Sequence, residues 1–185
     1  MKVAVHQPNY LPWPGFFHKM AHCDVFVLLD NVQYPRRGFC NRTMVKSPQG
    51  KAVWLTVPVM KSKDHQQIRD VQLFQPEENL AKQRLTLQHF YGRAPYYRYL
   101  ADCLEAVFAD KWLKLEPLNV TLIKVFAEIL GIHTPLLPAS SLGELEDVKS
   151  GRIIALCQKL GATRDHYPLG KSGGVTCLSS IHLEN

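Results

Sequence analysis

Long apolar runs are missing from this sequence of 185 residues. No run approaches the roughly 20 apolar residues that a membrane-spanning helix needs. Only three apolar residues separate Lys2 from His6, which is too few for the apolar segment of a secretory signal peptide. We therefore expect a cytoplasmic protein without a membrane span.

The cysteines and histidines also lack the patterns of a disulfide framework or a metal site. The five cysteines are odd in number, widely spaced and without a CxxC pair. The histidines show no metal-ligand spacing. We expect free thiols in a reducing compartment and no metal ion, and no residue pattern identifies a cofactor.

The chain is basic, with a net charge of +6 and a pI of about 9.1. It contains no recognition helix, zinc finger or aromatic RNA-binding signature, which argues against a nucleic-acid partner. A mildly basic protein without such signatures favours an anionic small molecule, such as a phosphate, as its ligand.

The first thirty residues predict a strand, a helix and a second strand. Lys2–His6 alternates weakly as a strand, and the prolines within Gln7–Pro14 predict a rigid loop. Apolar residues recur at helical spacing over Gly15–Cys23, and Val25–Leu29 is the continuous apolar run of a strand buried on both faces. The order indicates a βαβ unit with a parallel sheet.

Strand patterns continue after this unit. Phe39–Lys46 and Ala52–Met60 flank a Pro- and Gly-containing turn, which predicts a β-hairpin inserted after the βαβ unit. Ile68–Phe74 is a weaker strand pattern.

The later half is mainly helical. Helical periodicity and end signals predict three helices, over Pro76–Tyr91, Pro95–Ala109 and Glu116–Leu130. Thr134–Ala139 reads as a short strand. Ser140 or Ser141 is expected to cap a last helix that ends near Leu160. The fold class is therefore α/β.

The segment from His6 to Gly15 is the best candidate site. His6 ends the first strand, where open α/β sheets bind ligands, and prolines stiffen the loop that carries Asn9 and Tyr10. Gly15 permits close backbone approach, and the following helix N-terminus offers unpaired N–H groups to an anion. We expect His6 to be functional and Trp13 to be part of the core.

The second strand also ends in polar residues. Asp30 follows the buried strand and is predicted at the same edge of the sheet, where a carboxylate can orient a histidine, bind a hydroxyl group or act as a base. Gln33 and Asn41 add amide groups nearby. Arg37 and Arg42 offer bidentate contacts to phosphate or carboxylate.

These residues carry a family resemblance. Residues 6–42, HQPNYLPWPGFFHKMAHCDVFVLLDNVQYPRRGFCNR, closely resemble the opening of the WbqC-like family. Agreement continues through residues 54–59, 91–97 and 150–152, so it covers roughly residues 2–163. The resemblance implies a role around nucleotide-linked sugars in surface-polysaccharide (O-antigen) biosynthesis, with group transfer as the reaction.

The resemblance also implies the domain boundary. We expect residues 1–163 to form a single α/β domain. Family members run further with a different pattern, so we expect residues 164–185 to be an atypical tail from a truncated or frame-shifted reading frame.

Three functional hypotheses follow. The first is a transferase with His6 as acid or base, Asp30 as its partner, an anion clamp of Arg37, Asn41 and Arg42, and a nucleotide sugar as ligand. The second is nucleotidylyl transfer, since a histidine at the end of strand one is similar to the HxGH motif, although Asn9 replaces the second histidine. The third is a noncatalytic partner in a biosynthetic complex.

Overall fold

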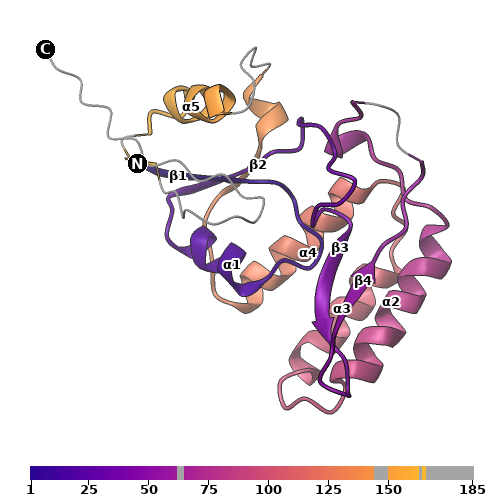
Figure 1. Ribbon diagram of the computed structural model, residues 1–185. Helices are drawn as coiled ribbons and strands as arrows, with labels where there is room; N and C mark the ends of the chain where they lie inside the picture. The colour runs from indigo at the N-terminus through magenta and orange to yellow at the C-terminus, as the bar shows by residue number, and fades with distance from the viewer. Residues whose placement is uncertain (62–64, 144–149, 163, 166–185) are drawn as a thin grey trace, which may run out of the picture. The chain divides into compact units, whose positions relative to one another are not determined.

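The structure is a computed structural model that describes residues 1–61, 65–143, 150–162 and 164–165. Its contacts divide the chain into two units (Figure 1). Unit 1 contains Met1–Pro8, Trp13–Val32 and the described residues from Ala127 onward, and unit 2 contains Asn9–Pro12 and Gln33–Phe126. Among the described residues, no helix is long and apolar enough to cross a membrane.

Unit 1 is built on a parallel sheet in the order β5-β2-β1-β6. Its strands are β1 (Lys2–His6), β2 (Val25–Leu28), β5 (Leu136–Pro138) and β6 (Arg164–Asp165). Strands β1 and β2 pair in register from Val3↔Val25 to His6↔Leu28. The predicted strands and parallel pairing are confirmed.

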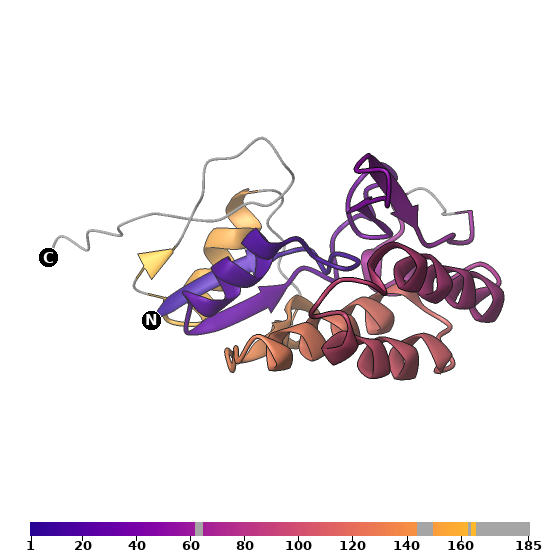
Figure 2. The ribbon, with the colours of Figure 1, turned by 90° about the horizontal axis from the view of Figure 1, so that it is seen from below.

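Helices cover both faces of this sheet (Figures 1 and 2). Helix α1 (Pro14–Ala21) packs on one face, where the Phe16 ring centroid lies 5.0 Å from that of Phe26. Helix α5 (Ser150–Lys159) covers the other, where buried side chains share one apolar cluster. That cluster contains Val3, Val5, Val27, Ala139, Ile153, Leu156 and Cys157. Burial on both faces explains why β1 and β2 are almost continuously apolar.

Unit 2 contains the predicted hairpin and three helices. Strands β3 (Arg42–Lys46) and β4 (Ala52–Thr56) are antiparallel, with Met44 opposite Trp54. The helices are α2 (Pro76–Tyr91), α3 (Arg98–Ala109) and α4 (Leu115–Ile129), the last of which also enters unit 1. The helical later half is confirmed, and the fold class is α/β as predicted.

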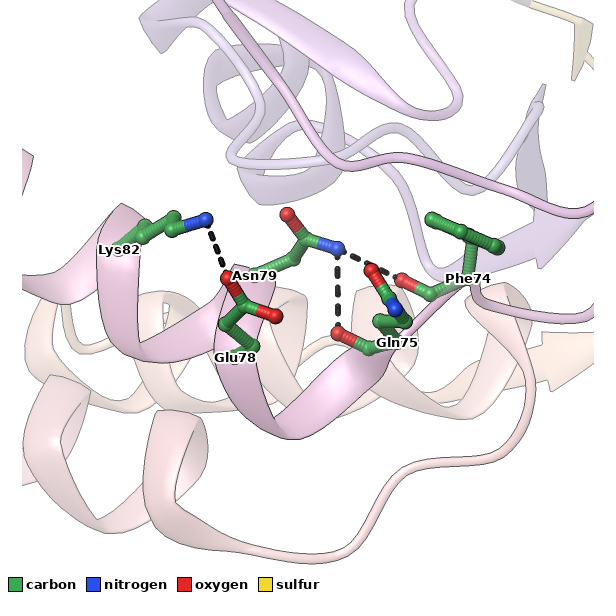
Figure 3. Close-up of polar contacts among 5 residues, drawn as sticks. All are labelled: Phe74, Gln75, Glu78, Asn79 and Lys82. Atoms are coloured by element: carbon green, nitrogen blue, oxygen red, sulfur yellow. Dashed lines mark hydrogen bonds and ion pairs between the residues drawn. The ribbon is translucent and has the colours of Figure 1, made fainter.

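Helix α2 begins with a local side-chain anchor (Figure 3). Gln75, the residue before the helix, has a positive φ of 42°. Asn79 donates from Nδ2 to the carbonyl oxygens of Phe74 (2.8 Å) and Gln75 (3.1 Å). These bonds hold the strained turn that precedes the helix.

Two element predictions are wrong. The segment predicted as a strand over Ile68–Phe74 forms a 3₁₀ helix, η1 (Ile68–Asp70), followed only by isolated bridges. Ile68 and Val71 are both fully buried, and their spacing of three fits a helical turn rather than an alternating strand.

The predicted start of the last helix is the second error. Ala139–Leu142 forms a separate 3₁₀ helix, η2, and α5 begins at Ser150. Neither Ser140 nor Ser141 caps α5. The Ser140 hydroxyl group donates to Asp30, and the Ser141 hydroxyl group donates to the carbonyl oxygen of Pro138. Helix α3 also begins at Arg98 rather than at Pro95.

Candidate active site

The carboxyl ends of β1 and β2 carry the two predicted catalytic residues. His6 is the last residue of β1 and is level with Leu28, and Asp30 lies just beyond the end of β2. Both side chains are buried at this edge of the sheet. Within the described residues no hydrogen bond joins His6 to Asp30, because each has other partners.

His6 lies on the α1 side of the sheet. Its ring packs edge-on against Phe16, with centroids 4.9 Å apart, and its Nδ1 lies 2.9 Å from the carbonyl oxygen of Gln7. Burial, together with the nearby Lys19 cation, lowers the pKa of His6 from 6.5 to about 4. The imidazole is therefore neutral at physiological pH.

The Gln7 contact also fixes the position of the single imidazole proton. A carbonyl oxygen can only accept a hydrogen bond, so Nδ1 of His6 must donate the proton to Gln7. In a neutral ring this leaves Nε2 without a proton. His6 thus offers Nε2 as a proton acceptor that is unprotonated at neutral pH, and its lowered pKa makes it a weaker base than an ordinary imidazole.

Lys19 is a polar neighbour that the sequence interpretation missed. Its Nζ donates to the carbonyl oxygen of Val5 at 2.8 Å and lies 5.8 Å from the Phe26 ring centroid. Burial lowers the pKa of Lys19 to about 8. The spacing of three residues from Phe16 could have indicated that Lys19 shares the inward face of α1.

Asp30 has a structural partner within unit 1. Its Oδ1 accepts the backbone N–H of Ser140 at 2.9 Å, and its Oδ2 accepts the Ser140 hydroxyl group. The carboxylate thereby fastens the end of β2 to η2. This arrangement suits a positioning role for Asp30 at the sheet edge.

A third contact joins the same edge to α5. Arg152 donates from Nη1 to the carbonyl oxygen of Asn31 at 3.1 Å. The side-chain Oδ1 of Asn31 is buried, and the described residues provide it with no hydrogen-bond partner. In the sequence, Arg152 lies in the part of the family resemblance at residues 150–152, but no pattern there predicts its contact with Asn31.

Trp13, which was expected in the core, lies at the surface. Its side chain is 55% exposed, so the prediction that it belongs to the core is wrong. The ring lies over the start of α1, and a Cβ added to Gly15 would fall 1.8 Å from it. Gly15 is needed for this close approach.

In unit 2, the loop residues Asn9 and Tyr10 are buried. The Tyr10 hydroxyl group donates to Oε1 of Gln83 at 3.3 Å, and Gln83 donates to the carbonyl oxygen of Thr56 at 2.7 Å. The backbone N–H of Tyr10 donates to Phe39 at 3.0 Å. Tyr10 therefore connects its loop to the hairpin and to α2.

The predicted anion clamp is divided between structural and exposed residues. Asn41 donates from Nδ2 to the carbonyl oxygen of Val57 at 3.0 Å. Arg42 donates from Nε to Gly38 (3.2 Å) and from Nη2 to the carbonyl oxygen of Arg37 (2.6 Å). These bonds shape the loop before β3 and leave the Arg37 side chain exposed on it.

Gln33 is the remaining predicted contact residue. Its side chain is exposed, and its backbone forms an isolated antiparallel bridge with Gln67. In unit 2, Gln33 and Arg37 are thus the predicted residues most open to a ligand.

A comparison with protein families matches residues 7–176 to the WbqC-like protein family. The match spans most of the chain. The chain belongs to the WbqC-like protein family. The match includes part of the predicted atypical tail, and the first described tail residues form β6 in the sheet. The later tail, residues 166–185, lies outside the described residues.

This WbqC-like protein is 36% identical over 164 residues to the uncharacterized protein Rv1507c of Mycobacterium tuberculosis. The alignment covers 88% of this chain and 70% of the relative. No solved structure matches the chain.

Proposed function

We propose that this WbqC-like protein is a transferase-type enzyme that acts on an activated sugar or amino-sugar intermediate in surface-polysaccharide (O-antigen) biosynthesis. The observation that carries the proposal is the neutral, buried His6, whose Nδ1 donates to Gln7 and whose Nε2 is left unprotonated as an acceptor. The nature of the substrate follows from the resemblance to the WbqC-like family. A nucleotide sugar is the proposed donor.

In the proposed step, Nε2 of His6 accepts the proton of a hydroxyl or amino group on the acceptor. That oxygen or nitrogen forms a bond to the reacting carbon of the donor. The bond from this carbon to the nucleoside diphosphate breaks at the same time, and the electron pair leaves with the diphosphate. His6 returns its proton to solvent after the product departs.

Other residues have supporting roles in this proposal. Asp30 acts through Ser140 as a positioning residue at the edge that carries His6. Within unit 2, the exposed Gln33 and Arg37 remain candidate ligand contacts, and the Arg37 guanidinium suits a phosphate group. Tyr10 and Arg42 hold the loop that carries Arg37, through their hydrogen bonds to Phe39 and to Arg37 and Gly38.

Two substitutions of His6 distinguish the role of Nδ1 as a donor from the role of Nε2 as an acceptor. In His6→Asn the amide nitrogen stands near Nδ1 and preserves the donor to Gln7, but the acceptor at Nε2 is lost. In His6→Gln the amide stands near Nε2, and the bond to Gln7 is lost. His133→Asn, at an exposed histidine, is the matched control.

The experiment first screens nucleotides and nucleotide sugars for a rise in melting temperature, and then measures turnover of the stabilising compound with sugar acceptors. We expect His6→Asn to fold, to keep the ligand-induced rise, and to lose turnover by about 10²- to 10⁴-fold. We expect His133→Asn to behave as the wild type.

Three results would contradict the proposal. Full turnover by both His6 variants would remove His6 from the chemistry. Release of pyrophosphate from a nucleoside triphosphate would indicate nucleotidylyl transfer. Binding of a nucleotide sugar without conversion, across varied acceptors, would indicate a noncatalytic partner.

A further inference from the structure

The β3–β4 hairpin presents an apolar face that the proposed function does not use. Because side chains alternate along a strand, Met44 and Trp54 share the face opposite to the buried Thr43 and Leu55. Met44 is 51% exposed and Trp54 is 44% exposed. Phe39, 37% exposed, adds its ring 5.7 Å from the Trp54 ring.

The charged residues of the segment that carries this apolar cluster are all of one sign. Residues 31–63 contain no aspartate or glutamate. The basic residues of this segment that the structure describes are Arg36, Arg37, Arg42, Lys46, Lys51 and Lys61. The hairpin is therefore a cationic surface with large exposed apolar side chains.

A second cationic segment adjoins the turn end of the hairpin (Figure 1). The backbone N–H of Lys46 donates to the Tyr91 hydroxyl group at 2.8 Å, which brings the connection between α2 and α3 beside the hairpin. Residues 79–101 contain no acidic residue and include the exposed Arg93 and Arg98. Both segments thus complement a negatively charged partner.

The arrangement of Trp54 distinguishes between two kinds of anionic partner. The Arg42 guanidinium carbon lies 4.3 Å from the centre of the Trp54 ring and occupies one ring face. Single-stranded nucleic acid binds by stacking bases on open aromatic faces, and Met44 has no ring to offer. Exposed tryptophan, phenylalanine and methionine beside lysine and arginine instead suit a lipid interface, where apolar groups insert and basic groups meet anionic headgroups.

We propose that the outward face of the β3–β4 hairpin docks on the surface of an anionic phospholipid bilayer. Met44, Trp54 and Phe39 enter the interfacial region, and Lys46 and Lys51 pair with lipid phosphates. Docking is peripheral and reversible, since the inserted surface is small. The proposal is independent of the chemistry at His6.

The test is co-sedimentation of the full chain with vesicles of phosphatidylcholine alone or mixed with phosphatidylglycerol. Two variants remove the two contributions separately: Met44→Ser for insertion, and the double variant Lys46→Gln with Lys51→Gln for charge. The glutamine at position 46 keeps the backbone bond to Tyr91. Leu113→Ser and Lys124→Glu, at exposed sites on other segments, are the matched controls.

We expect binding to the mixed vesicles only. The double lysine variant should weaken that binding by at least about tenfold, Met44→Ser should weaken it severalfold, and both controls should bind as the wild type does. Melting temperatures identify any variant that has lost its fold. If one of the two hairpin variants is unfolded, vesicle binding by the other one tests the proposal.

Absence of binding to the mixed vesicles would overturn the proposal, as would binding that neither folded hairpin variant reduces. Binding of a single-stranded oligonucleotide, in place of vesicles, that the same variants abolish would identify a nucleic-acid surface instead. None of these outcomes changes the expected result for His6→Asn.

Discussion

The buried neutral His6 makes stability depend on pH in a defined window. Its pKa is about 4 in the folded protein and 6.5 in an unfolded chain, so between these values the unfolded chain binds more protons. The free energy of unfolding should therefore be unaffected by His6 above pH 6.5 and should fall as the pH decreases toward 4. Across this pH window, the free energy of unfolding should decrease by about 3 kcal/mol in total through His6.

Urea unfolding at several pH values measures this effect. His6→Asn carries no titrating group, so its stability should fall less between neutral and acidic pH than that of the wild type. Parallel pH profiles of the two proteins would show that His6 is not buried in its neutral form.

Lys19 should modulate the same histidine. Lys19→Met removes the cation but keeps an apolar stem on the inward face of α1. The pKa of His6, followed by NMR, should rise, because one of the two causes that lower it has been removed. It should stay below 6.5, since burial is the larger cause. The exposed Lys2→Met is the control, and a His6 pKa that Lys19→Met leaves unchanged would contradict the electrostatic coupling.

The contact between Asp30 and Ser140 can be tested against a neighbouring serine. Ser140→Ala removes a hydrogen bond to a buried carboxylate and should lower the free energy of unfolding by about 1.5–3 kcal/mol. Ser141→Ala, whose exposed hydroxyl group donates only to the carbonyl oxygen of Pro138, should cost less than about 0.5 kcal/mol. Equal losses in chemical denaturation would show that Asp30 does not depend on Ser140.

At the scale of single residues, the sequence predicted where the site residues lie in the sheet better than it predicted their hydrogen-bond partners. The ends of two apolar strands predicted that His6 and Asp30 lie at one sheet edge. Their partners could not be predicted, because Ser140 is 110 residues away from Asp30 and Gln7 acts through its backbone. Arg42 looked like a ligand residue because its bonds to Arg37 and Gly38 depend on the local loop conformation.

At the scale of elements, the start of α2 gives a direct test of local anchoring. Asn79→Ala removes two hydrogen bonds to the strained turn at Gln75 and should cost about 1 kcal/mol. Lys82→Ala, which removes only an exposed pair with Glu78, should have little effect. Urea denaturation of the full chain compares them, and an unchanged midpoint for Asn79→Ala would contradict the anchoring role.

Elements with long periodic patterns were predictable, and short ones were not. The bounds of α2 match the prediction because proline and glutamates mark its start and Gly92 follows its end. The strand predicted over Ile68–Phe74 is wrong because so short an apolar run fits a helical turn and a strand equally well. The prediction of Ser140 as a helix cap is wrong because a serine hydroxyl group can equally well bind a carboxylate that is distant in the sequence.

At the scale of the whole molecule, charge is distributed unevenly along the chain. The net charge of +6 first suggested only a small anionic ligand. The structure gathers two acid-free segments around the β3–β4 hairpin, which adds a second interpretation for the same charge. Sequence reasoning did not reach this surface, because the exposure of Met44 and Trp54 depends on which face of the hairpin is buried.

The central claim is that His6 is a neutral imidazole with its proton on Nδ1 and a free lone pair on Nε2. Nitrogen-15 NMR of the imidazole in the full chain at neutral pH measures this protonation state directly. We predict the chemical shifts of a protonated Nδ1 and an unprotonated Nε2 for His6. An imidazolium ring, or a neutral ring with its proton on Nε2, would contradict the account.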